Sequence, residues 1–333
     1  MKITFGQPPE WFPPVKLKGL EHVFLREPID GYRSQYIHMF LQDMQQLVPL
    51  GSRRERDAYF DIETNDQQLA IKTLAALDRK YRSTHMADAL RHILSFTAME
   101  LFQAGRSVIA LRTKLDEYEW NITSVHPSAS RIVSLGPFLI QFLPERDNGY
   151  FGKDAETYSR EIRILNRKSV LCIELPSTLK RFKEKFLKRL QLLSNLANPD
   201  TDKLFPPISL ENPNPRKNIL DFSAFRKNFD IALFQTIRET GWMARNFTGE
   251  EKSDFLTSVW RLRFRKFQAT LRMEIIRQLN EQIPNIIRQS SPDFEMFIRE
   301  KGLLTPDELT NMERQLYAGD ISFEEVIDST FSL

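Results

Sequence analysis

Residues 104–143 read AGRSVIALRTKLDEYEWNITSVHPSASRIVSLGPFLIQFL, and they interrupt a chain whose earlier pattern is helical. Val, Ile, Trp and Phe dominate short segments that Pro or Gly separates, as β-strands require. The same texture continues to Pro176, and the five predicted strands are Val108–Leu111, Trp120–Val125, Phe138–Leu143, Glu161–Leu165 and Val170–Leu175. Short links favour antiparallel pairing. The sequence therefore predicts a helix-rich α+β fold, with a small, mostly antiparallel sheet in the middle of the chain and long C-terminal helices.

Apolar residues at helical spacing predict helices on both sides of this sheet. They cover residues 32–48, residues 66–104 with a break near Ser83-Thr84, a segment that begins at Ser177, residues 222–240 and residues 249–289. Gly105 is expected to end the second of these helices. Capping boxes are expected at Thr248, Thr305 and Ser322. Pro284 is expected to kink or end the longest helix.

Composition divides the chain into four consecutive segments. Residues 1–31 are Pro-rich and predict an extended N-terminal arm, laid on a surface because Trp11 and Phe12 favour burial. Residues 32–176 form the helix-plus-sheet segment. A basic helix, a Pro-rich loop and a return helix occupy residues 177–248. A long basic helix and an acidic tail of two short helices occupy residues 249–333.

Several classes of protein are excluded by what the sequence lacks. No apolar run is long enough for a membrane helix, and the N-terminus does not have the pattern of a signal peptide. Cys172 is the single cysteine, so we expect a buried thiol without a disulfide or a cysteine-rich metal site. No phosphate-binding or dinucleotide-binding glycine motif occurs, and no nucleophile elbow. We therefore expect that the protein binds no cofactor and is not an enzyme.

Two patterns come closest to metal chemistry. Tyr59-Phe-Asp-Ile-Glu-Thr64 resembles the first motif of DEDD exonucleases, in which Asp61 and Glu63 would bind a divalent metal. That motif should end a buried strand, whereas charged residues precede it here, so we interpret it as a loop or a helix start. His85 and His92 are seven residues apart without a third ligand at metal-binding spacing.

Charge is distributed unevenly along the chain. Residues 160–191 carry ten Lys or Arg against three Glu, residues 255–289 carry seven against two, and residues 290–333 carry ten Asp or Glu against three basic residues. Such asymmetry is typical of a basic surface that meets a polyanion, although pairing with carboxylates of the chain itself is the alternative. The candidate contact residues are Lys180, Arg181, Lys183, Lys185, Lys188, Arg189, Arg261, Arg263, Arg265, Lys266 and Arg272.

The order of elements resembles the wing region of tailed-phage portal proteins. A helix ends at Gly105, the strand Val108–Leu111 comes after it, Asn121–Pro127 is next, and Asn166–Pro176 feeds a helix. A second similarity is the segment Phe255–Phe267, which resembles the Arg-Leu-Arg-x-Arg-Phe helix of myovirus-type portals. In that family this helix precedes a Gln-Leu pair and a later helix start, to which Gln278-Leu279 and Gly302–Glu308 are similar.

The resemblance implies a structural role. About twelve copies would form a ring at one capsid vertex, with double-stranded DNA passing through it by non-specific contact. Capsid, terminase and neck proteins would be partners, in the virion or the host cytoplasm. The Pro-rich span 197–218 leaves little room for a clip domain. Two alternatives stay open: a cytosolic nucleic-acid-binding or regulatory protein that uses residues 180–189 and 261–277, and a metal-dependent nuclease centred on Asp61 and Glu63.

Overall fold

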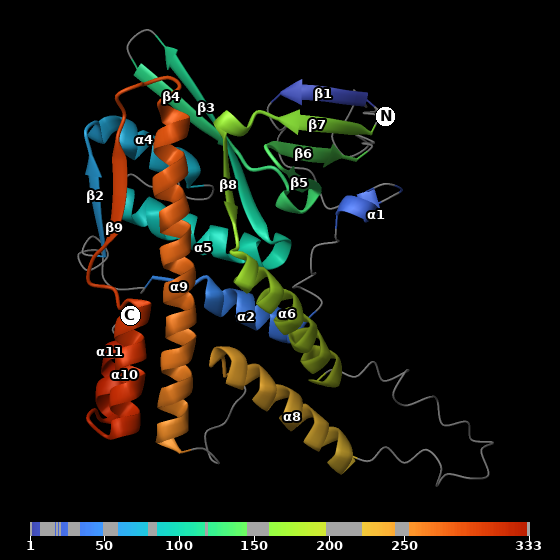
Figure 1. Cartoon of the computed structure of the whole chain (residues 1–333), viewed down its shortest axis with the longest axis vertical. Helices are drawn as coiled ribbons and strands as arrows, with labels where there is room; N and C mark the ends of the chain where they lie inside the picture. Colours follow the sequence, from blue (N-terminus) through green and yellow to red (C-terminus); the bar gives the residue numbers. More distant parts are fainter. Residues whose placement is uncertain are drawn as a thin grey trace, which may run out of the picture. The chain divides into compact units, whose positions relative to one another are not determined.

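The computed structural model describes most of the chain as two compact units. The described residues are 2–6, 17, 19, 21–25, 34–48, 59–78, 85–116, 119–144, 160–197, 222–243 and 253–331. Unit 1 comprises residues 1–29, 45–175 and 271–303, and unit 2 comprises residues 30–44, 176–270 and 304–333. Each unit is therefore built from segments that are distant in the sequence. The long helix α9 (Asp254–Ile287) contributes residues to both units (Figure 1).

The described residues of unit 1 form three small sheets. Sheet A has the order β1-β7-β6-β5, formed by Lys2–Gly6, Glu161–Leu165, Phe138–Leu143 and Ile132–Leu135 (Figure 1). Sheet B pairs β2 (Phe60–Thr64) with β9 (Met296–Glu300), and sheet C has the order β4-β3-β8, formed by Glu119–Val125, Arg106–Asp116 and Val170–Glu174. All pairings are antiparallel except that of β1 with β7, which is parallel.

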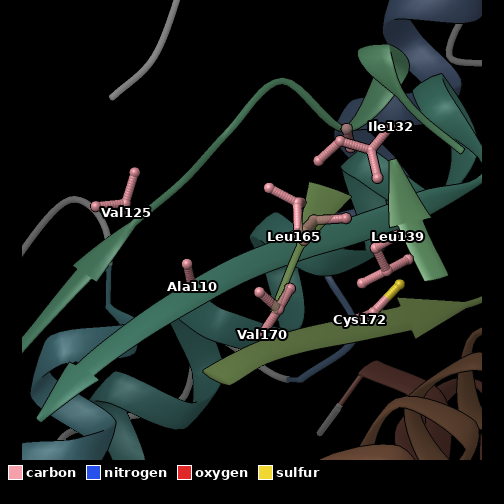
Figure 2. Packing of buried hydrophobic residues seen from close by; sticks show 9 residues of the cluster. Ala110, Val125, Ile132, Leu139, Leu165, Val170 and Cys172 are labelled. Atoms are coloured by element: carbon pink, nitrogen blue, oxygen red, sulfur yellow. The ribbon is translucent and has the colours of Figure 1, made fainter. Parts of the chain in front are cut away.

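The core of unit 1 lies between sheets A and C. Figure 2 shows the side chains of Ile132, Leu139 and Leu165, which belong to sheet A, facing Ala110, Val170 and Cys172 of sheet C. The helices α4 (Gln67–Leu77) and α5 (Met86–Ala104) pack against sheet C. Gly105 ends α5 with a φ of 83°, and its N–H donates to the carbonyl of Leu101. The expected C-terminal glycine cap is confirmed.

The other face of sheet A is apolar as well. Direct register pairs place Phe5, Ile164, Ile140 and Val133 on this face, one from each strand. Leu17 and Leu25 pack on it, and the ring of Phe24 stacks on Phe142 at 5.9 Å. A buried ion pair between Glu21 and Arg131, at 3.3 Å, attaches the short helix α1 (Glu21–Phe24) to the unit.

Unit 2 is helical and its core is aromatic. It contains α2 (Gln35–Met44), α6 (Ser177–Ala197), α8 (Phe222–Thr240), the first half of α9, α10 (Pro306–Ala318) and α11 (Phe323–Phe331). Phe40 of α2 lies edge-on to Phe186 and to Trp242, with ring centroids 4.7 Å and 5.4 Å apart. The indole N–H of Trp242 donates to Asp43 at 2.8 Å, which satisfies its polar edge within the core.

The observed elements confirm the predicted fold class, a helix-rich α+β protein with small sheets. The five predicted strands form, and so do the capping boxes at Thr305 and Ser322. Thr248 and the arm residues Trp11 and Phe12 lie outside the described residues. Pro284 does not end α9, which continues to Ile287. Within the described residues, none of the helices combines the length and the apolar composition that crossing a bilayer requires.

Candidate interaction surfaces

The basic–aromatic block of α9 is largely engaged inside unit 2. Trp260 is buried, and Arg263 donates to the Glu313 carboxylate of α10 at 2.8 Å. Arg265 donates to Gln268 at 3.1 Å. Burial lowers the pKa of Arg261 from its ordinary value. The ion pair between Arg263 and Glu313 corresponds to the alternative interpretation of the charge pattern, in which basic residues pair with carboxylates of the same chain.

Arg272 belongs to the interior of unit 1. It is 4% exposed, and its guanidinium donates to the carbonyl of Leu47 and to the Glu300 carboxylate, both at 2.9 Å. Because Arg272 has almost no exposed surface, it offers little to DNA or to a partner.

Further along α9, hydrogen bonds from Arg277 hold the pKa of Glu274 below its usual range, although partial burial opposes this shift.

The basic helix α6 has two kinds of lysine and arginine. Lys180 and Lys183 are half-buried and engaged in interactions within the protein, and Arg189 forms an ion pair with Glu239 of α8. Arg181, Lys185 and Lys188 are exposed. Their i, i+4, i+7 spacing places them on one side of the helix. The buried side carries Phe186, Leu190 and Leu193, as the predicted stripe requires.

Exposed apolar residues accompany this basic stripe. Leu192 continues it at the next helical step and is half-exposed. On α8, which packs against α6, Ile231 and Phe234 are exposed as well, with Phe234 at 54%. We call this set the basic–apolar surface: Arg181, Lys185, Lys188, Leu192, Ile231 and Phe234.

A second exposed surface of unit 2 lies where α9 begins and α10 and α11 meet. The ring of Phe255 contacts those of Tyr317 and Phe323, at 5.3 Å and 6.4 Å between centroids. Tyr317 is 57% exposed, and Leu256 and Phe323 are also exposed. Asp320 and Glu324 are exposed beside them in the sequence. We call this set the acidic–apolar surface: Leu256, Tyr317, Asp320, Phe323 and Glu324.

Sheet A carries exposed apolar side chains near both of its edges, at β1 on one side and at the β5–β6 hairpin on the other. Phe5 of β1 is 79% exposed, and Ile3 beside it is exposed too. At the opposite end, Leu135 of β5 and Phe138 of β6 form a register pair, and Phe138 is 54% exposed. Register places all four on the same face of the sheet. Within the described residues, β1 pairs only with β7, and β5 pairs only with β6.

The residues closest to metal chemistry do not assemble a metal site in the part of the chain that the structure describes. Asp61 and Glu63 lie on β2, a strand rather than the expected loop or helix start, and this interpretation was wrong. Both side chains are exposed, and Glu63 pairs with Arg299 of β9 at 3.3 Å. Their strand is paired with β9 by five register pairs, which explains how so polar a segment is held in place.

The histidines and the cysteine are engaged in packing. His85 precedes α5, and His92 contacts the buried carboxylate of Asp78 at 3.1 Å. Cys172 is buried, as expected, and the sequence holds no second cysteine with which it could form a disulfide. A hollow of about 480 Å³ beside β2 is lined by Asn280, Arg288 and Glu63 among others. Asn280 and Arg288 both bind backbone groups of the β9 segment, so their polar atoms serve the fold.

Comparisons with known proteins add no family. A scan against protein-family models finds no match, and a search of curated proteins finds none either. The candidate surfaces therefore stand on the geometry of this chain. Sequence reasoning found the basic stripe of α6 but missed its apolar companions and those of sheet A. Ile231 and Phe234 give no clear local signal, because Phe234 lies three residues before the buried Ile237 and one residue after the buried Leu233 on α8.

Proposed function

We propose that this chain is a structural subunit of a ring that resembles a phage portal and forms a DNA passage at a capsid vertex. The order of elements supports this proposal: α5, Gly105 and β3 are followed by β4, β8 and α6, and later by the long helix α9. This is the order on which the resemblance rests. In this proposal the protein acts by assembly, in the virion or the host cytoplasm, with capsid, terminase or neck proteins as partners.

The observation that carries the proposal is the exposure of apolar side chains at both ends of sheet A. An edge strand with exposed apolar residues is a template for pairing with another chain, and monomeric proteins usually blunt such edges. Unit 1 protects the edge strand β8 of sheet C, because side-chain amides of α9 form hydrogen bonds with backbone groups of β8. No such protection of β1 is present among the described residues.

The two edges of sheet A are different surfaces, which favours a head-to-tail assembly. A contact between the β1 end of one copy and the β5 end of the next is heterologous, so every copy keeps one open end until the chain of copies closes. Closure produces a ring of about twelve copies when the rotation per subunit is about 30°. A ring of this kind supplies the passage that the portal resemblance implies.

The second candidate function is nucleic-acid binding by α6. Arg181, Lys185 and Lys188 are exposed on one side of α6, where basic side chains are available to backbone phosphates. This function requires no ring, and it predicts an affinity that falls steeply as salt rises from about 50 mM to about 200 mM.

The ring proposal is tested with two edge variants, Phe5→Lys on β1 and Leu135→Lys on β5, compared by mass photometry. Both side chains are exposed, so a lysine should leave the isolated subunit folded while blocking one end of sheet A. Met273→Lys is the matched control, because Met273 is an exposed apolar residue on α9 rather than on the sheet. We expect Met273→Lys to assemble as the wild type does and each edge variant to lose the large species.

Mixing the two edge variants makes the test specific for head-to-tail contact. Each variant keeps the end that the other has lost, so the mixture should form dimers and nothing larger. Edge variants that assemble as fully as the Met273→Lys control would contradict the proposal. Monomers of the wild type that bind DNA with a steep salt dependence would support the second candidate instead.

A further inference from the structure

We propose that the basic–apolar surface of one copy binds the acidic–apolar surface of a second copy of this chain. The inference rests on the proposed ring and names surfaces of unit 2 that meet at each contact. It also assigns a role to the exposed basic side chains of α6, which would contact a protein surface rather than DNA.

The basic–apolar surface has the composition of a protein interface. Leu192, Ile231 and Phe234 form its apolar part, each at least 46% exposed. Arg181, Lys185 and Lys188 lie along the same helix as Leu192 and supply positive charge. An apolar centre with a charged rim is typical of specific protein–protein contacts.

Phosphate backbones fit this surface less well. DNA would pair with the three basic side chains but would leave Leu192, Ile231 and Phe234 against a charged, hydrated backbone. The hydrophobic contribution from covering those side chains, about 25 cal/mol per Å² of apolar area, would then be lost. The apolar part therefore favours a partner with apolar residues of its own.

The acidic–apolar surface offers the complementary composition on the same chain. Tyr317, Phe323 and Leu256 supply exposed apolar area, and the rings of Tyr317 and Phe323 are held by contact with Phe255. Asp320 and Glu324 supply negative charge in the turn and the first turn of α11. Tyr317 is further oriented by Arg263, whose guanidinium lies 3.4 Å from the tyrosine hydroxyl.

Charge complementarity identifies a second copy as the occupant. Both surfaces are exposed in one subunit, they differ in the sign of their charge, and each contains exposed aromatic or aliphatic side chains. Complementary potentials steer association and select the partner, and like charges placed opposite each other are strongly unfavourable. Because the two surfaces are different, this contact is heterologous, as the proposed ring requires.

Charge reversal with rescue tests the inference. One variant carries Lys185→Glu and Lys188→Glu, a second carries Asp320→Lys and Glu324→Lys, and a third carries all four substitutions. All four side chains are exposed, so circular dichroism should show folded protein in each case. We expect each reversed variant to need at least about tenfold more protein for half-assembly, and the combined variant to recover the wild-type value. Lys301→Glu, a charge reversal at an exposed position outside both surfaces, is the control.

The outcomes separate this inference from the ring proposal. A wild-type ring that is insensitive to both reversals, or that the combined variant fails to restore, overturns the inference and leaves the ring intact. Loss of DNA or anionic-vesicle binding in the Lys185→Glu/Lys188→Glu variant, without any change in assembly, assigns the surface to a polyanion and also overturns it. A wild type that stays monomeric at every concentration overturns both proposals.

Discussion

Gly241 holds the junction between α8 and the first half of α9 within unit 2. It has a φ of +75°, and its N–H donates to the carbonyl of Ile237 at 2.6 Å, which ends α8. A Cβ atom at this position would lie 2.1 Å from the carbonyl oxygen of Trp260 and 2.7 Å from the amide nitrogen of Phe264. The residue must therefore be glycine for two reasons, its left-handed backbone and the close approach of another helix.

We predict that Gly241→Ala strongly destabilises unit 2. A non-glycine residue in the left-handed region costs about 1–2 kcal/mol, and the overlap with backbone atoms of α9 should raise the loss to roughly 3 kcal/mol or more. Gly319→Ala is the matched control, because Gly319 has a φ of +79° with open space around its Cβ position. Urea denaturation followed by tryptophan fluorescence measures both, since Trp242 is adjacent to Gly241. Equal losses in the two variants would show that the close approach does not matter.

Single residues also show where sequence reasoning reaches its limit. Arg272 and Lys188 are both basic residues on predicted helices, and no local pattern separates them. The structure buries Arg272 against Leu47 and Glu300 and leaves Lys188 in solvent. Their difference depends on which segments pack against each helix, and those segments lie more than twenty residues away in the chain.

At the scale of elements, α9 is attached to two strands by side-chain amides. Gln278 and Gln282, one helical turn apart, each exchange two hydrogen bonds with the backbone of β8 at Glu174 and Cys172, at 2.8–3.0 Å. Asn280 does the same with Ile298 of β9, at 2.8 Å in both directions. These amides act as a substitute for a neighbouring strand, so Gln278, Asn280 and Gln282 pack against the strands with their amide groups hydrogen-bonded.

We predict that Gln282→Leu lowers the free energy of unfolding by about 1–3 kcal/mol. The substitution leaves an N–H and a carbonyl of the buried Cys172 without their partner. Gln278→Leu should have a smaller effect, because Glu174 is only half-buried. Thermal and chemical denaturation measure the changes.

Gln68→Leu is the control for these two variants, because Gln68 is exposed on α4. An effect of Gln282→Leu no larger than that of Gln68→Leu would mean that the amide contacts contribute nothing to the stability of unit 1.

The elements differ in how far the sequence predicted them. Five of the six strands between 106 and 174, all except β5, have the β-forming composition and the Pro or Gly boundaries that the prediction used. Sequence reasoning missed β1, β2, β5 and β9. Each has only four or five residues, and apolar types are mixed with polar or charged ones, as in Phe60-Asp-Ile-Glu-Thr64 and Met296-Phe-Ile-Arg-Glu300. Pairing with a distant partner determines these strands, and a local pattern cannot show that.

At the scale of the whole molecule, the units are assembled from interleaved segments, whereas the four predicted segments are consecutive along the chain. The basic–apolar and acidic–apolar surfaces become visible only when exposure is known for each side chain. Charge alone indicated residues 180–189, 261–277 and the acidic tail. Folding then pairs Arg263 with Glu313 and leaves Lys185, Lys188, Asp320 and Glu324 in solvent.

The proposed function requires that copies of this chain associate head to tail and close into a ring. The most direct measurement is mass photometry of the purified wild-type protein at low and moderate salt, followed by negative-stain imaging of the largest species. We predict a discrete species of about twelve subunits whose images show a closed ring with a central opening. A single population of monomers or of closed dimers, at every protein concentration and both salt concentrations, would contradict this claim.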